Sequence, residues 1–240
     1  MIINHNISAI NTHRQLGVNT NAVAKSLEKL SSGLKINRAG DDAAGLAISE
    51  KMRAQVRGLE MASKNAQDGI SLIQTAEGAL QETHAILQRM RELAVQAASD
   101  TNEDAVDRAA IQEEVEALIN ELNEITSRTE FNTQTLLDGT FTDKVFHIGA
   151  NKDQSITVSI DKMDAEALGV NDVDLSSQEN ANAAIETING AINTVSTQRA
   201  ALGAIQNRLE HTINNLGTSA ENLQAAESRI RDTDHTPVAA

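Results

Sequence analysis

The chain of 240 residues carries 20 basic and 34 acidic side chains, and its net charge of −14 argues against nucleic acid or an anionic membrane as a partner. Only 1% of the residues are aromatic, although 40% are hydrophobic, which excludes a base-stacking surface and disfavours a compact enzyme core. Cysteine is absent, so neither a disulfide nor a thiolate metal site can form.

The first forty residues form a basic amphipathic segment, with five lysine or arginine residues and one acidic residue. Ile3, Ile7 and Ile10, and later the apolar residues of 23–34, recur at spacings of three and four, which predicts helix with a phase break near Gly17. Such a face needs a partner helix; a helix lying on a membrane surface is the alternative. No stretch of the chain reaches the ~20 apolar residues of a membrane span, so we expect no membrane insertion.

A long helix is predicted to begin at Asp41 and Asp42, whose carboxylates suit the amino end of a helix. From Met52 to Leu87 its apolar residues follow a loose seven-residue repeat, which is typical of a helix that packs against other helices. A polar turn over residues 99–104 separates it from a shorter helix with a regular apolar seam, meaning a row of residues that faces neighbouring helices. The seam residues of this shorter helix are Ile111, Val115, Leu118, Leu122 and Ile125.

Residues 131–176 differ from the rest because they contain all three phenylalanines and two runs with alternating apolar and polar residues. The first run is Phe141 to Ile148 and the second is Ser155 to Ile160, and glycine and polar residues at 149–153 supply a turn between them. This pattern predicts a β-hairpin. It is too small to be a domain of its own, so we expect it to pack against the helices.

The last helix has the most regular seven-residue repeat, which extends from Ile185 to Ile230. The seam residues that we assign to it are Ile188, Val195, Leu202, Leu209, Leu216, Leu223 and Ile230. Arg199, Gln206 and Glu227 interrupt the repeat, either because they lie at the edge of the bundle with their polar ends in water or because they fix the helix register through buried polar pairs. No single helix of this kind can bury its seam alone. The sequence therefore predicts a mainly α fold, an elongated bundle of long antiparallel helices with a small β-hairpin region.

Residue patterns that support catalysis are missing. The six histidines have no metal-ligand spacing, and the glycines make no phosphate-binding loop. We therefore expect no enzyme activity, no metal site and no cofactor, and function must come from the surfaces of the helices.

Several blocks of the sequence, in the same order, strongly resemble bacterial flagellin. The blocks are Leu30 to Met52, Arg57 to Leu80, Gln88 to Gln96, Glu130 to Gly139, Phe146 to Asn151 and Glu221 to Asp234. The resemblance implies a secreted structural subunit that leaves the cell through the flagellar export apparatus. Other flagellin subunits would be its partners in an extracellular filament that serves motility.

The end of the chain departs from the family. Flagellins continue into a further amphipathic helix that partners the N-terminal one, whereas this sequence ends in a tail, residues 235–240, that contains Pro237. We therefore divide the chain into an N-terminal segment 1–40, which belongs to the inner filament core and is unpaired or frayed here, a helical rod 41–234, and the tail. The family's export chaperone is not expected to bind, because its C-terminal site is missing.

The resemblance also implies a receptor-binding patch. Arg89, Leu93 and Glu114 match the flagellin patch recognised by the vertebrate flagellin-sensing toll-like receptor. Arg89 and Leu93 are four residues apart, so we expect them to be exposed anchors on one helix face, with Glu114 on the antiparallel neighbour. Alternatively, Arg89 and Leu93 serve the packing between filament subunits. For the whole chain the alternatives to a filament subunit are a monomeric, non-polymerising receptor agonist and a hook–filament junction protein.

Overall fold

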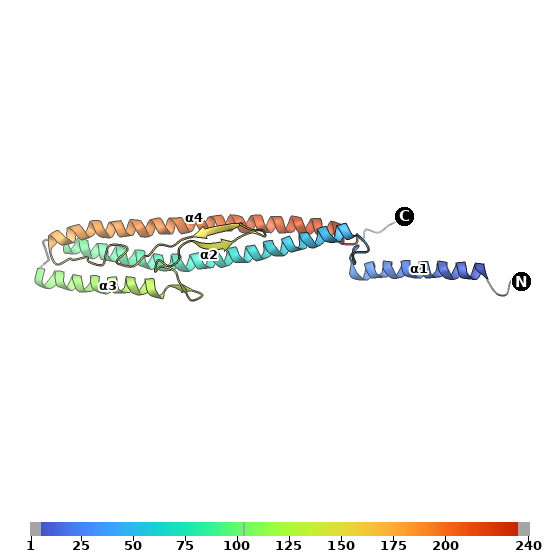
Figure 1. Ribbon diagram of the computed structural model, residues 1–240. Coiled ribbons are helices and arrows are strands. Elements are labelled where there is room, and N and C mark those ends of the chain that lie inside the picture. The colour runs from blue at the N-terminus through green and yellow to red at the C-terminus, as the bar shows by residue number, and fades with distance from the viewer. Residues whose placement is uncertain (1–5, 103, 235–240) are drawn as a thin grey trace. The chain divides into compact units, whose positions relative to one another are not determined.

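The structure is a computed structural model that describes residues 6–102 and 104–234. Within these residues it contains four α-helices, one π-helical turn and two two-stranded antiparallel sheets (Figure 1). The chain divides into two compact units, Met61–Leu216 as unit 2, and Met1–Glu60 with Gly217–Ala240 as unit 1. The predicted mainly α fold with a small β region is confirmed. None of the helices in the described residues is long and apolar enough to cross a membrane.

Unit 2 is a bundle in which α2 (Ala43–Ala97, here from Met61), α3 (Ala109–Arg128) and α4 (Gln178–Arg231, here to Leu216) lie side by side (Figure 1). Their aliphatic side chains form one core. Its fully buried leucines include Leu80 and Leu87 of α2. Because burial of each such side chain contributes roughly 1.5–3 kcal/mol, packing outweighs the cost of about 1 kcal/mol for each helical glycine.

The α4 seam is confirmed in unit 2, where the predicted residues are all buried: Ile188, Val195, Leu202, Leu209 and Leu216. Leu223 and Ile230, in unit 1, are half-buried. Between the seam residues, Ala184 and Ala191 are buried while Ile185 and Ile192 are only half-buried. Small side chains let neighbouring helices approach closely, so the alanines take the centre of the contact and the larger isoleucines its edge.

The α3 seam is confirmed only in part. Ile111, Val115 and Leu122 are buried, but Leu118 and Ile125 are half-buried at the edge, and Ile119 and Thr126 take the buried positions. A seven-residue repeat assumes 3.5 residues per turn, whereas a straight helix has 3.6, so the buried stripe moves along the sequence. Thr126 is tolerated inside because its hydroxyl lies 3.0 Å from the carbonyl oxygen of Leu122 and 3.2 Å from that of Met163.

The predicted hairpin is present as β3 (Lys144–His147) paired with β4 (Ser155–Val158). It packs on α2, where the Asn65 amide donates a hydrogen bond of 3.0 Å to the His147 carbonyl, and a Cβ added at Gly69 would lie 3.4 Å from the Phe146 ring. A second, unpredicted hairpin joins β1 (Glu130–Phe131) to β2 (Gln134–Thr135). Its turn residues Asn132 and Thr133 have φ angles of 49° and 63°. Glycine is the usual sequence signal for a turn with positive φ angles, and neither of these residues is glycine.

In unit 1, α1 (Ile7–Ser32) is an unbroken helix that passes through Gly17, where the spacing of the apolar residues changes phase. Its N-cap is Asn6, whose side chain accepts a hydrogen bond from the Ala9 amide at 3.2 Å, and it ends at Gly33 with a φ of 70°. No residue of α1 is buried, and seven of its large apolar residues are 58–70% exposed. Fraying of this segment stays a prediction, and Ile3 and the tail 235–240 lie outside the described residues.

Asp41 and Asp42 were both predicted to cap α2, but only one of them does so. Asp42 caps the helix by accepting a hydrogen bond of 2.9 Å from the Gly45 amide. Asp41 instead closes the preceding turn by accepting from the amides of Arg38 and Asn37 at 3.1 and 3.2 Å. These two backbone hydrogen bonds, that from Arg38 first, hold the pKa of Asp41 below its ordinary value.

A clasp of backbone hydrogen bonds in unit 1 joins residues 33–36 to residues 231–233. The Lys35 amide donates to the Arg231 carbonyl at 2.7 Å, and the Thr233 amide donates to the Gly33 carbonyl at 2.8 Å. The Arg231 side chain adds an ion pair of 2.6 Å with Glu50 of α2. The clasp thus ties the segment that follows α1 to the end of α4.

Two of the three residues that interrupt the α4 repeat form ion pairs with α2. Glu227 pairs with Arg53 at 3.1 Å within unit 1, and Arg199 pairs with Glu77 at 3.6 Å within unit 2. Gln206 donates to Glu210 on its own helix at 3.0 Å. The side chains of these two ion pairs are 15–37% exposed, so they are not the buried polar pairs that the register interpretation requires. Gln206 fits the edge interpretation.

Candidate functional site

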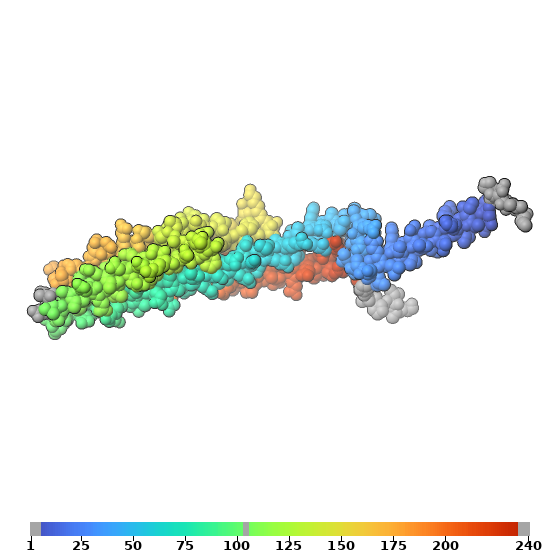
Figure 2. All heavy atoms as spheres, turned by 90° about the horizontal axis from the view of Figure 1, so that it is seen from below, coloured from blue at the N-terminus to red at the C-terminus, as the bar shows by residue number. Residues whose placement is uncertain are grey.

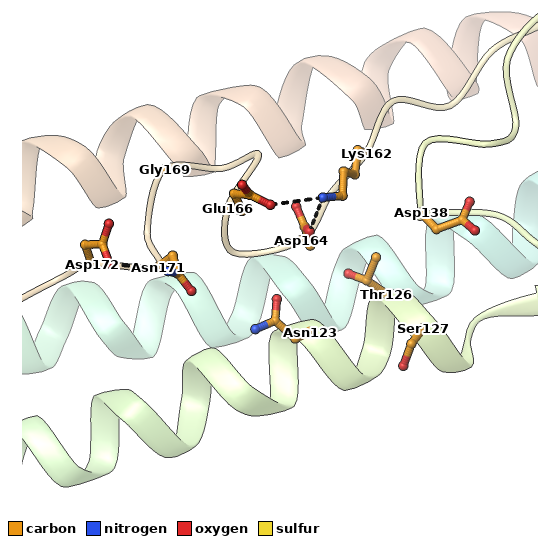
Figure 3. A pocket seen from close by; sticks show the side chains of 10 residues that line it. All are labelled: Asn123, Thr126, Ser127, Asp138, Lys162, Asp164, Glu166, Gly169, Asn171 and Asp172. Atoms are coloured by element: carbon orange, nitrogen blue, oxygen red, sulfur yellow. Dashed lines mark hydrogen bonds and ion pairs between the residues drawn. The ribbon is translucent and has the colours of Figure 1, made fainter.

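The described residues hold no group of three or more histidine, aspartate or glutamate side chains that could bind a metal ion. A polar hollow lies in unit 2, between α3 and the loop that precedes α4 (Figure 3). In it Lys162 forms ion pairs with Asp164 at 2.6 Å and with Glu166 at 3.3 Å. Burial raises the pKa of Asp164, but hydrogen bonds from Lys162 and the Ala167 amide outweigh it and leave that pKa below its ordinary value. These ion pairs join residues within the loop itself.

The structure brings two of the three predicted receptor-binding residues together on the surface of unit 2. Arg89 of α2 donates from Nε to Oε1 of Glu114 on α3 at 2.9 Å, and its Nη2 lies 2.8 Å from the same oxygen. Glu92, one turn further along α2, contacts Arg89 at 3.3 Å. The Arg89 and Glu114 side chains are 50% and 44% exposed, so a partner protein could reach both. The hydrogen bond to Glu114, above all, raises the pKa of Arg89 above its ordinary value.

Leu93 does not belong to this exposed surface, and the expectation that it is an exposed anchor is wrong. It is only 2% exposed and lies in the core of unit 2. Four residues of an α-helix turn through about 400°, so Leu93 is rotated about 40° from Arg89, which here separates the surface from the core. Leu93 therefore supports the surface from beneath.

Arg108 is a buried residue whose structural role the sequence analysis missed. It lies in the π-helical turn η1 (Asp104–Arg108), is buried, and donates from Nε to the Ala97 carbonyl at 2.7 Å and from Nη2 to the Ser99 carbonyl at 2.9 Å. Cations that bind the last carbonyls of a helix satisfy its orphan acceptors and its dipole. The residue fastens the start of α3 to the end of α2. No local pattern reveals this role, because the arginine follows the helix end by eleven residues.

Comparison with known proteins gives consistent matches. The model of the bacterial flagellin N-terminal helical region matches residues 3–142, and that of the bacterial flagellin C-terminal helical region matches residues 185–239. A flagellin of Bacillus subtilis (strain 168) is 57% identical, with 98% of this chain and 88% of the relative covered. A flagellin of Halalkalibacterium halodurans is also 57% identical, covering 98% and 86%. The crystal structure of Bacillus cereus flagellin superposes with a TM-score of 0.59 at 31% identity, covering 68% of this chain and 94% of that one.

Proposed function

The chain belongs to the bacterial flagellin family and is therefore a subunit of the flagellar filament, and we propose that it is also a ligand of the vertebrate flagellin-sensing toll-like receptor. Flagellins are structural proteins that are exported from the cell and polymerise with other flagellin subunits. A surface that binds a different surface on the next copy without closing a ring gives such a filament. The helical surfaces of this chain, rather than a catalytic centre, thus carry the first role.

The observation that supports the receptor proposal is the pair Arg89–Glu114. Arginine is enriched among the residues that dominate binding energy in protein interfaces. Here Glu114 and Glu92 hold the guanidinium in one orientation, so less side-chain freedom is lost when a receptor binds. The buried Leu93 supports the same turn of α2 from the core side.

A receptor-activation assay with purified monomer tests the proposal. We expect Arg89→Ala to weaken activation roughly 30-fold, the effect of losing about 2 kcal/mol at a binding hot spot. The matched control is Arg128→Ala, because Arg128 is also an exposed arginine of unit 2 in an ion pair, with Glu124. Activation that Arg89→Ala and Glu114→Ala leave unchanged, with folding intact by circular dichroism, would reject the proposal.

Light scattering separates the filament from the soluble-agonist alternative. With a net charge of −14, copies repel one another, so added salt should accelerate assembly. A chain that stays monomeric across a salt series, yet activates the receptor, would favour the non-polymerising agonist. We also infer that the chain reaches the outside through the flagellar export apparatus. The hook–filament junction alternative is not proposed, because both matching family models are flagellin models.

A further inference from the structure

The four α-helices of the described residues differ in net charge, and α1 and α3 are the extremes. α1 carries three lysine or arginine residues and one acidic residue, whereas α3 carries five acidic residues and one arginine. Basic and acidic residues balance in α2, and α4 has one more acidic than basic residue. Among these helices α1 is therefore the positive one, and α3 is the most negative.

α1 is also a helix whose surface is uncovered, since it buries no residue. Arg14, Val18 and Lys25 lie within about 40° of one another around the helix, so they form one side of it, which we call the basic face. Val18 on this face is 60% exposed. The one carboxylate of α1, on Glu28, is engaged by Arg38 at 2.9 Å. The basic face thus combines unburied cations with an exposed apolar side chain.

The outer surface of α3 has the opposite charge. Glu113, Asn120 and Glu124 are exposed and lie within about 40° of one another around the helix, and we call them the acidic face. Figure 2 shows α3, in green, along the surface of unit 2. Glu124 pairs with Arg128 on its own helix, whereas Glu113 forms no ion pair with any residue that the structure describes. The acidic face can therefore receive cations from a partner.

The two faces match in spacing as well as in charge. Arg14 and Lys25 are 11 residues apart, and so are Glu113 and Glu124. At 1.5 Å per residue, the two charges on each face are separated by roughly 16 Å along the helix. Two straight helices that lie side by side can therefore form both ion pairs at once.

We propose that the basic face of α1 in one copy docks antiparallel on the acidic face of α3 in a second copy. The partner is a second copy because subunits of this family associate with one another, and each copy carries both faces. In this register Val18 lies opposite Asn120. A parallel arrangement with the same spacing would place Lys29 opposite Arg128, and repulsion between these two cations favours the antiparallel one.

Ionic strength separates this contact from filament assembly. At about 0.1 M salt the Debye length is about 10 Å, which screens the repulsion between distant charges of two copies but spares contacts at ion-pair distance. At about 1 M it is about 3 Å, and the ion pairs are screened as well. Added salt should therefore abolish this contact while it accelerates filament assembly. The inference goes beyond the filament role and does not depend on it.

Disulfide cross-linking tests the contact directly, because the natural chain has no cysteine. Chains with Val18→Cys and tagged chains with Asn120→Cys are mixed at about 0.1 M salt, oxidised mildly and separated on a non-reducing gel. We expect severalfold more mixed dimer than from Val18→Cys with tagged Met61→Cys. Met61 is the matched control because it is an exposed residue of unit 2 outside α3. At about 1 M salt the mixed dimer should fall to the control level.

A charge swap tests whether the ion pairs hold the two copies together. Lys25→Glu in the Val18→Cys chain should lower the yield of mixed dimer severalfold, and Glu113→Lys in the Asn120→Cys chain should restore it. The matched control is Lys51→Glu, which makes the same change of charge at an exposed lysine of α2 and should leave the yield unchanged.

Three results would overturn the proposal. The first is a yield of mixed dimer no higher than that of the Met61 control. The second is a preference for dimers of two Val18→Cys chains, because these require two α1 helices to pair. The third is cross-linking of Asn11→Cys to Ala110→Cys rather than to Ser127→Cys, because a parallel pair would bring Asn11 and Ala110 together. Electron microscopy at higher salt scores filaments separately, so filaments without the cross-link would reject the contact and leave the filament role intact.

Discussion

Replacing Leu93 by alanine distinguishes a buried support from an exposed anchor. The side chain is 2% exposed within the core of unit 2, and truncation of a buried leucine costs about 2–5 kcal/mol, from lost burial and from the cavity that remains. Arg89→Ala removes only a half-exposed ion pair, which contributes about 0–1 kcal/mol. For a domain of this size, each kcal/mol lowers the melting temperature by roughly 2–4 °C. Leu93→Ala should therefore melt roughly 4–20 °C lower than the natural chain, and Arg89→Ala within a few degrees of it.

Thermal unfolding followed by circular dichroism, combined with the receptor-activation assay, tests whether Leu93 is a buried support or an exposed anchor. Leu93→Ala should lose activation only where unit 2 begins to unfold, and cooling the assay should restore it. Leu93→Met is the control, because a swap that conserves volume costs less than about 1.5 kcal/mol. An unchanged melting temperature for Leu93→Ala, together with loss of activation as large as that of Arg89→Ala, would refute the buried role of Leu93. It would indicate instead that Leu93 is an exposed contact residue.

Two further predictions concern unit 1. Amides of α1 should exchange with solvent far faster than those between Ile188 and Leu216 of α4, because α1 buries no residue; equal protection in hydrogen-exchange mass spectrometry would contradict this. The hydrogen bond from Arg231, opposed by burial, lowers the pKa of Glu50 below its usual 4.5. The ionised Glu50 therefore stabilises the folded state fully above pH 4.5, and this stabilisation is lost as the pH falls through the lower pKa of the folded state. Protection of residues 33–36 should therefore decrease in acid, and Glu50→Gln should remove that dependence.

The sequence predicted those parts of the fold that depend on local pattern. The α4 seam, the β3–β4 hairpin and the cap at Asp42 follow from repeats of seven or two residues and from a carboxylate before a helix, and each is confirmed. These signals act within a few residues of chain. A single sequence carries them in full.

The sequence did not predict features set by distant contacts. Thr126 replaces Ile125 in the core because the Met163 carbonyl, which comes from a later loop, lies within hydrogen-bonding distance of its hydroxyl. Arg108 is buried because the end of α2 offers it carbonyl groups. For the candidate site, the proximity of Arg89 and Glu114 was predictable from the antiparallel arrangement of the two helices. The burial of Leu93 was not, because it depends on how much of the α2 surface the core covers.

The end of α2 sets the position of the proposed receptor-binding surface. The hydrogen bonds from Arg108 to Ala97 and Ser99 fix where η1 and α3 begin. That position sets the register in which Glu114, six residues later, meets Arg89. A buried cation with carbonyl partners is hard to replace, since loss of one side leaves the other unsatisfied in the core. Loss of the Arg108 side chain should therefore disturb the position of α3 along α2 even though Arg108 lies outside the exposed Arg89–Glu114 pair.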